Sequence, residues 1–330
     1  MKRERWGNTI LIRPEAAAVW PRENHTAWQK WDGWFRTDRD NRHGTWEWKK
    51  NIPAPWTVCY RDLAFLIRPT TSKQLGLFPE QAVNWDWCTQ KTKSSVAKGH
   101  SINLLNLFGY TGAATVAAAR AGASVCHVDA SKAMVSWCAD NLSAQSTAAA
   151  KGCVASVLAP SSIPYTLSCC APSAPCPSSA AATVQTDSKN ARLMNMDDAS
   201  KTPVRFIVDD CLKFIERELR RGHRYDAIIL DPPTFGRGAR GELWKIEDQL
   251  QRLLESCGEL LSENPLFFLL NTYSPMLSQR MLEEIFRTGL STDNPLARAA
   301  KPESTFLGLQ GTLDSKIIPC GMTTRWEFKF

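Results

Sequence analysis

The stretch 101–131 combines a glycine turn with an acidic strand end, a pattern that suits nucleoside binding. An apolar run ending at Phe108 is followed by Gly109-Tyr110-Thr111-Gly112, an alanine-rich segment and a second apolar run ending at Asp129. Such runs are typical of buried parallel strands, and ligands bind beyond the carboxyl ends of these strands. Glycines let the backbone pass close under a ligand, the following helix offers N–H groups to an anion, and an acid can accept from two ribose hydroxyls.

The glycine spacing differs from that of a dinucleotide fingerprint. Ala113 and Ala114 follow Gly112, whereas G-x-G-x-x-G requires a further glycine in register. The turn therefore suits a smaller anion better than a pyrophosphate. Since the chain also lacks a recognisable Tyr-Lys or His-Asp arrangement, an NAD-dependent oxidoreductase is disfavoured.

A second polar motif, Asp231-Pro232-Pro233, ends the apolar run 227–230 and precedes Phe235. Consecutive prolines fix the backbone and remove two N–H donors, so the nearby carbonyls become rigid acceptors. A carboxylate beside such a carbonyl can take both hydrogens of an exocyclic amine or orient a ring nitrogen. A proline turn that caps a strand would explain this tripeptide alone, but its place about one hundred residues after Asp129 favours a functional role.

Together the two motifs resemble those of class I S-adenosylmethionine-dependent methyltransferases. The resemblance implies an α/β fold with a Rossmann-like sheet, mostly parallel with an antiparallel C-terminal hairpin, and S-adenosyl-L-methionine (SAM) as the cofactor. In this family an acid after the third strand meets the adenine amine; Asp210 is in register for that role and Asp209 is the competitor. The implied cofactor-binding residues are Phe108, Gly109, Thr111, Gly112, Asp129, Ala130, Asp210 and Asp231.

The segment before this domain resembles a narrower family, the bacterial methyltransferases that modify cytosine C5 or guanine in large-subunit ribosomal RNA. Two alternating segments, 57–60 and 63–68, predict a hairpin, and a K-x-x-G-x-F-x-x-Q loop follows it. In that family the loop folds over the cofactor, which implies a covering role for Gly76, Phe78 and Gln81. RNA, ribosomal in kind, is then the expected partner, with neither a metal nor a membrane.

The cysteine positions argue against cytosine C5 as the target. Enzymes that methylate C5 first add a cysteine thiolate to C6 of the base. Where the family's cytosine enzymes carry this cysteine, after the fifth strand, the chain has Tyr273, and no cysteine accompanies the D-P-P motif. Cys211 and Cys257 are poor substitutes by their positions.

We therefore expect a nitrogen target on guanine or adenine. Asp231 and the Pro232 carbonyl would orient it, and Phe235 or Tyr273 would stack on a base taken out of its helix. A methyltransferase for small molecules or proteins is one alternative. A SAM-binding pseudoenzyme that acts as an RNA-binding module is another.

Composition divides the chain into three parts. Residues 1–90 form a β-rich N-terminal extension, 91–145 and 203–330 form the methyltransferase domain, and 146–202, rich in Ala, Ser and Pro, form a disordered insertion. Eight of the thirteen tryptophans lie in the first 60 residues, interleaved with arginine and lysine. Stacking of bases on exposed rings would serve single-stranded nucleic acid, but we expect most of these rings to build a core.

Several elements are expected around the motifs. Helices are predicted at 132–142, 212–221 and 244–261, a fifth strand at 266–270, and C-terminal strands at 317–319 and 325–330. Asn141 is either a helix C-cap or the asparagine frequent in the family. The basic loop 236–241 is either a clamp for a substrate phosphate or a solvated loop.

Overall composition adds bounds on partner and compartment. The 330 residues can bury a full α/β core, and the net charge of +7 moderately favours a polyanionic partner. Eleven cysteines without a C-x-x-C pair, and no secretory leader, indicate reduced thiols and a cytoplasmic location, with an organelle as the alternative.

Overall fold

The computed structural model describes residues 1–22, 25–38, 44–146, 193–194, 203–237, 243–290, 301–311 and 316–328. These belong to two compact units, one comprising Met1–Ala82, Asp140–Thr186 and Leu309–Pro319 and the other comprising Val83–Ala139, Asp187–Gly308 and Cys320–Phe330. Most of the predicted insertion, 147–192 and 195–202, lies outside the described residues. The predicted domain boundaries and the disorder of the insertion stay predictions.

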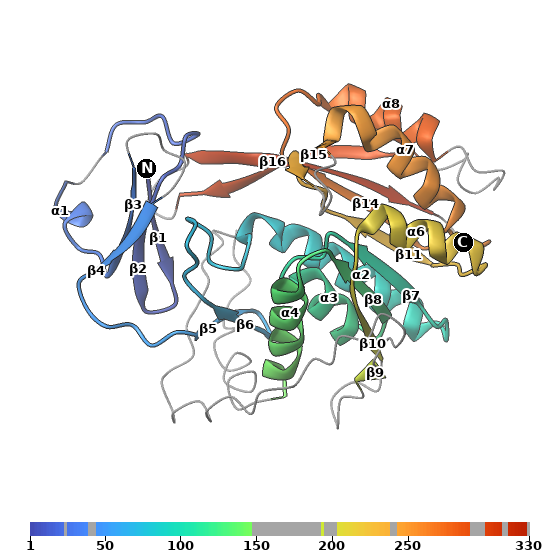
Figure 1. Ribbon diagram of the computed structural model, residues 1–330, viewed down its shortest axis with the longest axis horizontal. Coiled ribbons are helices and arrows are strands. Elements are labelled where there is room, and N and C mark those ends of the chain that lie inside the picture. Colours follow the sequence, from blue (N-terminus) through green and yellow to red (C-terminus); the bar gives the residue numbers. More distant parts are fainter. Residues whose placement is uncertain are drawn as a thin grey trace. The chain divides into compact units, whose positions relative to one another are not determined.

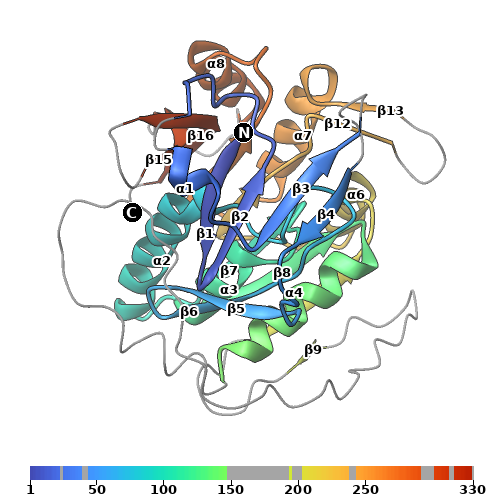
Figure 2. The same cartoon turned by 90° about the vertical axis from the view of Figure 1, so that its left-hand side faces the viewer.

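The first unit is built mainly from short strands. Its elements are β1 (Lys2–Trp6), β2 (Thr9–Arg13), α1 (His25–Trp28), β3 (Gly33–Thr37), β4 (Gly44–Trp48), β5 (Trp56–Tyr60), β6 (Leu63–Ile67) and the 3₁₀ turn η1 (Pro79–Gln81). Strands β1 to β4 form one sheet in chain order (Figure 2). The predicted hairpin is confirmed as β5 and β6, which pair antiparallel. An N-terminal β-rich region is therefore present, as predicted.

The second unit contains the large sheet and its helices. Its elements are α2 (Ala82–Ala97), β7 (Asn103–Leu107), α3 (Ala113–Arg120), β8 (Ser124–Asp129), α4 (Lys132–Ala144), β9 (Leu193–Met194), β10 (Val204–Val208), α6 (Cys211–Arg220), β11 (Ala227–Leu230), β12 (Phe235–Arg237), β13 (Leu243–Lys245), α7 (Ile246–Glu259), β14 (Phe267–Thr272), α8 (Gln279–Gly289), β15 (Glu303–Gln310) and β16 (Ile317–Glu327). Helix α4 and strands β15 and β16 continue into the first unit.

The eight-stranded sheet has the order β15-β16-β14-β11-β7-β8-β10-β9. Strands β7, β8, β10, β11 and β14 are parallel, whereas β16 runs antiparallel to β14. The chain leaves β7 toward β8 and β10 in one direction, then continues as β11 and β14 on the other side of β7. This reversal of strand order is the topological switch point of a doubly wound sheet, and it confirms the predicted Rossmann-like fold class.

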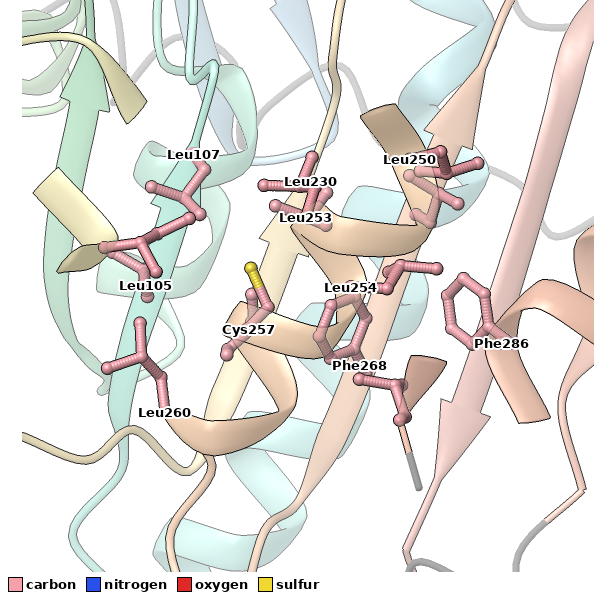
Figure 3. Packing of buried hydrophobic residues seen from close by; sticks show 14 of the residues in the cluster. Leu105, Leu107, Leu230, Leu250, Leu253, Leu254, Cys257, Leu260, Phe268 and Phe286 are labelled. Carbon is pink, nitrogen blue, oxygen red and sulfur yellow. The ribbon is translucent and has the colours of Figure 1, made fainter. Parts of the chain in front are cut away.

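Helices cover both faces of this sheet (Figure 1). On one face, α6, α7 and α8 pack a continuous apolar cluster against alternate residues of the strands, including Leu105, Leu230 and Phe268 (Figure 3). On the other face, α3 lies against β7 and β8, and Trp87 of α2 contacts Phe267 with ring centroids 5.0 Å apart. Burial on both faces explains why these strands read as unbroken apolar runs.

A buried amide pair ties the end of α4 to strand β6. Asn141 accepts a hydrogen bond from the Leu66 N–H at 2.8 Å, and Gln145 both accepts from the Ala64 N–H and donates to the Ala64 carbonyl. These side chains satisfy backbone groups that an edge strand leaves unpaired. The expectation of a C-cap at Asn141 is wrong, because α4 continues to Ala144.

Other predicted elements need smaller corrections. The helix predicted from 244 begins at Ile246, because Leu243–Lys245 form a strand with β12. The two short C-terminal strands are one long strand, β16, with β15 as its neighbour. The prediction that all cysteines are reduced is wrong for Cys59, which is disulfide-bonded. Within the described residues, no helix is long and apolar enough to cross a membrane.

Helix α6 buries a carboxylate, Glu218, that the sequence pattern did not reveal. Its side chain is fully buried and accepts from the Tyr225 hydroxyl at 2.6 Å, the His223 Nδ1 at 2.8 Å and the Arg205 guanidinium at 3.3 Å. Burial by itself raises the pKa of Glu218, but these hydrogen bonds and the charge of Arg205 outweigh it and lower the pKa to about 2. The carboxylate thus links α6 to the strands at their amino ends.

Replacing this carboxylate by an amide should destabilise the fold in a pH-dependent way. Because the folded-state pKa lies below the ordinary value of 4.5, the ionised group stabilises the protein above pH 4.5, and that contribution is lost as the pH falls toward 2. Glu218→Gln should lower the free energy of unfolding at neutral pH by about 3 kcal/mol and flatten its pH dependence in that range, measured by denaturant unfolding. Glu216→Gln, on the exposed side of the same helix, is the control. Equal stability of the two variants would contradict the assignment.

Candidate active site

The predicted site residues meet at the carboxyl ends of the central strands. Strand β7 pairs in register with β8 on one side and β11 on the other, so Leu107 lies opposite both Val128 and Leu230. The pairing of β11 with β7 continues through one more hydrogen bond, which the Asp231 N–H donates to the Leu107 carbonyl at 3.4 Å. The glycine turn, Asp129 and the D-P-P motif therefore lie at the same edge of the sheet.

The glycine turn is a tightly wound segment between β7 and α3. Phe108, Tyr110 and Gly112 all have positive φ angles, 55°, 51° and 80°. The Gly109 N–H donates to the Val128 carbonyl at 3.0 Å, and the Gly112 N–H donates to the Gly109 carbonyl at 2.9 Å. Two non-glycine residues in the left-handed region mark a strained turn held by its surroundings, a feature that clusters at ligand sites.

Both glycines are required by the protein layer beneath the turn. A Cβ at Gly109 would overlap the His127 ring, and a Cβ at Gly112 would overlap the Cys138 sulfur. The glycines thus meet a packing requirement of the protein itself, and their expected role in making room for a ligand stays a prediction. The turn packs directly on buried side chains, and this packing fixes its position in the site.

A hydrogen-bonded chain of buried side chains supports the turn from below. Asn106 donates to the Thr115 hydroxyl at 2.9 Å, and this hydroxyl lies 2.9 Å from the His127 Nδ1. Burial lowers the pKa of His127 to about 4, so the ring is neutral at pH 7. The chain connects β7, α3 and β8 and fixes the position from which α3 starts.

Asp129 is oriented by two backbone hydrogen bonds. One carboxylate oxygen accepts from the Tyr110 N–H at 2.9 Å and the other accepts from the Ser131 N–H at 2.8 Å. Partial burial raises the pKa of Asp129, and the two hydrogen bonds oppose that shift. A carboxylate has about four acceptor positions, so both oxygens can still accept hydrogen bonds from a ligand. Ala130, also predicted to contact the cofactor, is exposed beside it.

Helix α3 begins without a side-chain cap. Gly112 stands at the N-cap position and makes no side-chain hydrogen bond, and the first intrahelical hydrogen bond is donated by the Val116 N–H to the Gly112 carbonyl at 2.8 Å. The N–H groups of the first turn are unpaired within such a helix, and together with the helix dipole they favour an anion. A carboxylate at α3 and a diol at Asp129 are the two ends of a methionine-linked nucleoside, so the residues present fit SAM.

The two acids after β10 have different roles. Asp209 forms an ion pair with Arg217, and it also accepts from the Asp210 N–H at 2.9 Å. Asp210 caps α6 by accepting from the Lys213 N–H at 3.1 Å. Asp210 thus has the freer carboxylate of the two, and its contact with the adenine amine stays a prediction.

The D-P-P motif is braced by a tryptophan that was expected at the start of a helix. Trp244 on β13 donates from its indole N–H to the Pro233 carbonyl at 2.5 Å and packs against Phe108, with ring centroids 5.7 Å apart. One of the carbonyls near Asp231 is therefore occupied within the protein. The acidic first turn of α7, Glu247 and Asp248, would have marked the true helix start and left Trp244 outside it.

Phe235 and Tyr273 differ in their surroundings. Phe235, on β12, is 56% exposed and is thus accessible to a substrate. Tyr273 follows β14 and lies against Gly321 of β16, where an added Cβ would approach its ring at 2.9 Å. The next residue, Ser274, hydrogen-bonds to Glu247 of α7. Both aromatic roles stay predictions.

Two loops expected near the site are not decided by the structure. The segment with Gly76, Phe78 and Gln81 belongs to the first unit, and its cofactor-covering role stays a prediction. Residues 236 and 237 of the expected basic loop 236–241 belong to β12, whereas 238–241 lie outside the described residues.

Comparison with known proteins identifies the class to which this fold and site belong. A SAM-dependent methyltransferase from Agrobacterium tumefaciens is 30% identical, with a TM-score of 0.75 over 99% of this chain and 87% of that chain. The methyltransferase SMU.776, solved with SAH, shares the fold at 16% identity and a TM-score of 0.59, over 91% of this chain and 63% of that chain. No protein-family model matches the chain.

A curated relative is more distant and much longer. The ribosomal RNA large subunit methyltransferase K/L of Shewanella frigidimarina is 27% identical over 202 residues, which are 61% of this chain and 20% of that protein. The chain thus spans about a fifth of the length of this relative. On the likeness to the Agrobacterium protein, the chain belongs to the SAM-dependent methyltransferases, and SAM is its cofactor. The predicted family and cofactor are confirmed.

Asp129 should dominate the affinity for SAM and its demethylated product. Asp129→Asn should weaken binding by about 1.5 to 3 kcal/mol, the range for hydrogen bonds to a charged group, measured by titration calorimetry. Burial raises the pKa of Asp129, so this carboxylate becomes protonated at a higher pH than an ordinary aspartate. The SAM affinity of the wild type should therefore begin to fall at that higher pH on acidification. The affinity of Asp129→Asn should not show this pH dependence. Asp226→Asn, whose carboxylate accepts the Asn103 N–H at the opposite strand ends, is the control. Equal affinities in the two variants would refute the ribose role.

Gly112→Ala should damage the site more than an alanine at another left-handed glycine. Gly99 has a φ of +89° with nothing within 4 Å of an added Cβ, so Gly99→Ala measures the backbone cost alone, about 1 kcal/mol. Gly112→Ala carries the same backbone cost plus the overlap with Cys138, and it should also weaken SAM binding. Thermal unfolding and calorimetry on both variants check this. Similar losses would show that the turn is free to move.

Proposed function

We propose that the chain transfers a methyl group from SAM to a base nitrogen in RNA, with large-subunit ribosomal RNA as the substrate class. The observation that carries the proposal is the D-P-P motif at the end of β11, joined to the glycine turn through the Asp231 to Leu107 hydrogen bond. This hydrogen bond supports a role for the Asp231 carboxylate and the Pro232 carbonyl at the same sheet edge as the glycine turn. The name of the Shewanella relative supports RNA as the substrate, and a cytoplasmic location accords with this substrate.

The state of the nearby thiols favours nitrogen over cytosine C5. Cys211, the first residue of α6, is buried and its sulfur accepts the Phe108 N–H at 3.3 Å. Burial raises the pKa of the Cys211, Cys257 and Cys138 thiols well above the ordinary range. A C5 mechanism needs a thiolate at neutral pH, which these three side chains do not supply.

The chemistry required of the protein is then mainly orientation. SAM supplies an electrophilic methyl group, and a nitrogen lone pair can attack it directly when the two are aligned. The Asp231 carboxylate and the Pro232 carbonyl accept the hydrogens of the amine or orient a ring nitrogen, which points the lone pair at the methyl. Asp231 can also accept the proton that the nitrogen loses after transfer.

The exposed ring of Phe235 provides a stacking surface for the extruded base. It follows the D-P-P motif by two residues and is more than half exposed, which supports its contact with a base that Asp231 orients. Tyr273, at the end of the neighbouring strand β14, is the second stacking candidate. Stacking replaces the neighbours that the base loses when it leaves its helix.

Methylation of an unmodified large-subunit RNA transcript tests this function. Wild type should transfer the methyl of labelled SAM and yield an N-methylated guanine or adenine on nucleoside analysis. Asp231→Asn should lower the rate by about 10² or more, and Phe235→Leu by about 5- to 100-fold through lost stacking, with unchanged SAM affinity for Phe235→Leu. Met281→Ala, an exposed apolar change on α8, is the control.

Two results would refute parts of the proposal. Formation of 5-methylcytosine would refute the nitrogen target. Transfer to a small molecule or protein without transfer to RNA would refute the RNA substrate.

A further inference from the structure

The sheet of strands β1 to β4 has one buried face and one solvent-facing face. One row of paired residues crosses the four strands, and their side chains project from the same face of the sheet. The row consists of Arg3, Ile12, Trp34 and Glu47, each paired with the next. The alternate residues, among them Trp6 and Phe35, are 1% and 3% exposed. The row through Trp34 therefore lies on the more exposed of the two faces, and Ile12 within that row is itself fully buried.

This more exposed face is rich in cations. We name it the arginine face and define it by Arg3, Arg5, Trp31, Trp34, Arg36 and Lys49. Arg5 follows Arg3 by two residues on edge strand β1 and is exposed, and Arg36 follows Trp34 on β3 and is 46% exposed. Lys49 comes two residues after Glu47 and reaches Trp31.

Tryptophan rings hold two of these cations in place. The Arg36 guanidinium lies 3.6 Å above the Trp34 ring, and the Lys49 ammonium lies 4.3 Å from the Trp31 ring centroid. The two rings meet edge to face with centroids 5.6 Å apart. Cations over indole faces are partly preorganised, so less side-chain entropy is lost when they bind an anion.

Within the described residues, neither arginine of β1 forms an ion pair, but the Asp32 carboxylate acts electrostatically on Arg3. The Arg3 Nε donates to the Lys30 carbonyl at 3.2 Å, whereas the acids of this region, Glu47 and Asp32, pair with Arg36 and Lys50. Partial burial and the neighbouring Arg5 charge lower the pKa of Arg3. Two like charges held side by side favour a ligand with several closely spaced negative charges.

We infer that the arginine face binds the phosphate backbone of the RNA substrate. A cation lies over one face of the Trp34 ring and one face of the Trp31 ring, which blocks base stacking there and favours contacts to phosphates. The inference rests on the proposed function, since it supplies a second contact region for the same RNA. It also gives the tryptophan and arginine pattern of the first unit a role distinct from base stacking.

The salt dependence of RNA binding tests the inference. Binding of a fluorescently labelled single-stranded RNA is followed by anisotropy at several salt concentrations in wild type, Arg3→Gln/Arg5→Gln and the control Arg220→Gln/Arg280→Gln. The control removes two positive charges from α6 and α8. The Arg3/Arg5 variant should bind on the order of tenfold more weakly, and its plot of log K against log salt should lose about 1.4 in slope, the value for two phosphate contacts. The control should keep the wild-type slope, and both should keep wild-type SAM affinity.

The outcomes separate this inference from the proposed function. An unchanged slope in the Arg3/Arg5 variant, with wild type still binding and methylating RNA, would overturn the inference alone. SAM binding without any RNA binding in wild type would overturn both. Competition by polyglutamate as effective as by unlabelled RNA would point to an acidic protein and overturn the inference. Arg5→Gln alone, an exposed single change, serves if the double variant does not fold.

Discussion

The register of β7 between its two parallel neighbours is the constraint on which the site depends. Leu107 pairs with Val128 on one side and with Leu230 on the other, so the chain segments that follow these three residues emerge at one level. These segments are a strained turn, an acid at a strand end and a proline-fixed motif, and each contributes a different part of the site. A slip of one residue in either pairing would turn every side chain to the other face of the sheet. The packed helices on both faces therefore protect the geometry of the site.

Below the turn, buried polar groups restrict its sequence as strongly as a ligand would. Thr115 and His127 form a buried hydrogen-bonded contact, and Gly109 lies against the ring with no space for a side chain. A neutral histidine is tolerated there because burial penalises its charged form, as its pKa of about 4 reflects. The glycine pattern is thus a signature of close backbone packing first, and of cofactor binding as a consequence.

Features that are local in sequence could be predicted, and features that join distant segments could not. Short stretches of sequence are enough to recognise the strands, the glycine turn, Asp129 and the D-P-P motif, because apolar runs and turn residues mark each of them. The contact of Trp244 with Phe108 and the pairing of Asn141 with Leu66 join segments far apart in the chain, and no period in the sequence encodes them. Glu218 was missed because a charged residue on a helix is expected at the surface, and its four partners come from both sides of the helix end.

In the proposed site, different kinds of groups recognise the cofactor and the substrate, which would explain why the family determines the cofactor and leaves the substrate open. The proposed cofactor site consists largely of backbone, namely the start of α3 and the turn that orients Asp129, and backbone geometry persists where the fold persists. The proposed substrate side consists of side chains on the short β12–β13 ribbon after the D-P-P motif, where Phe235 is exposed and Trp244 is anchored. Such a ribbon can change its outward residues without disturbing the sheet, because its inner face is already fixed by the hydrogen bond to Pro233. Substrate choice within this family should therefore depend on the outward face of that ribbon more than on the sheet that carries it.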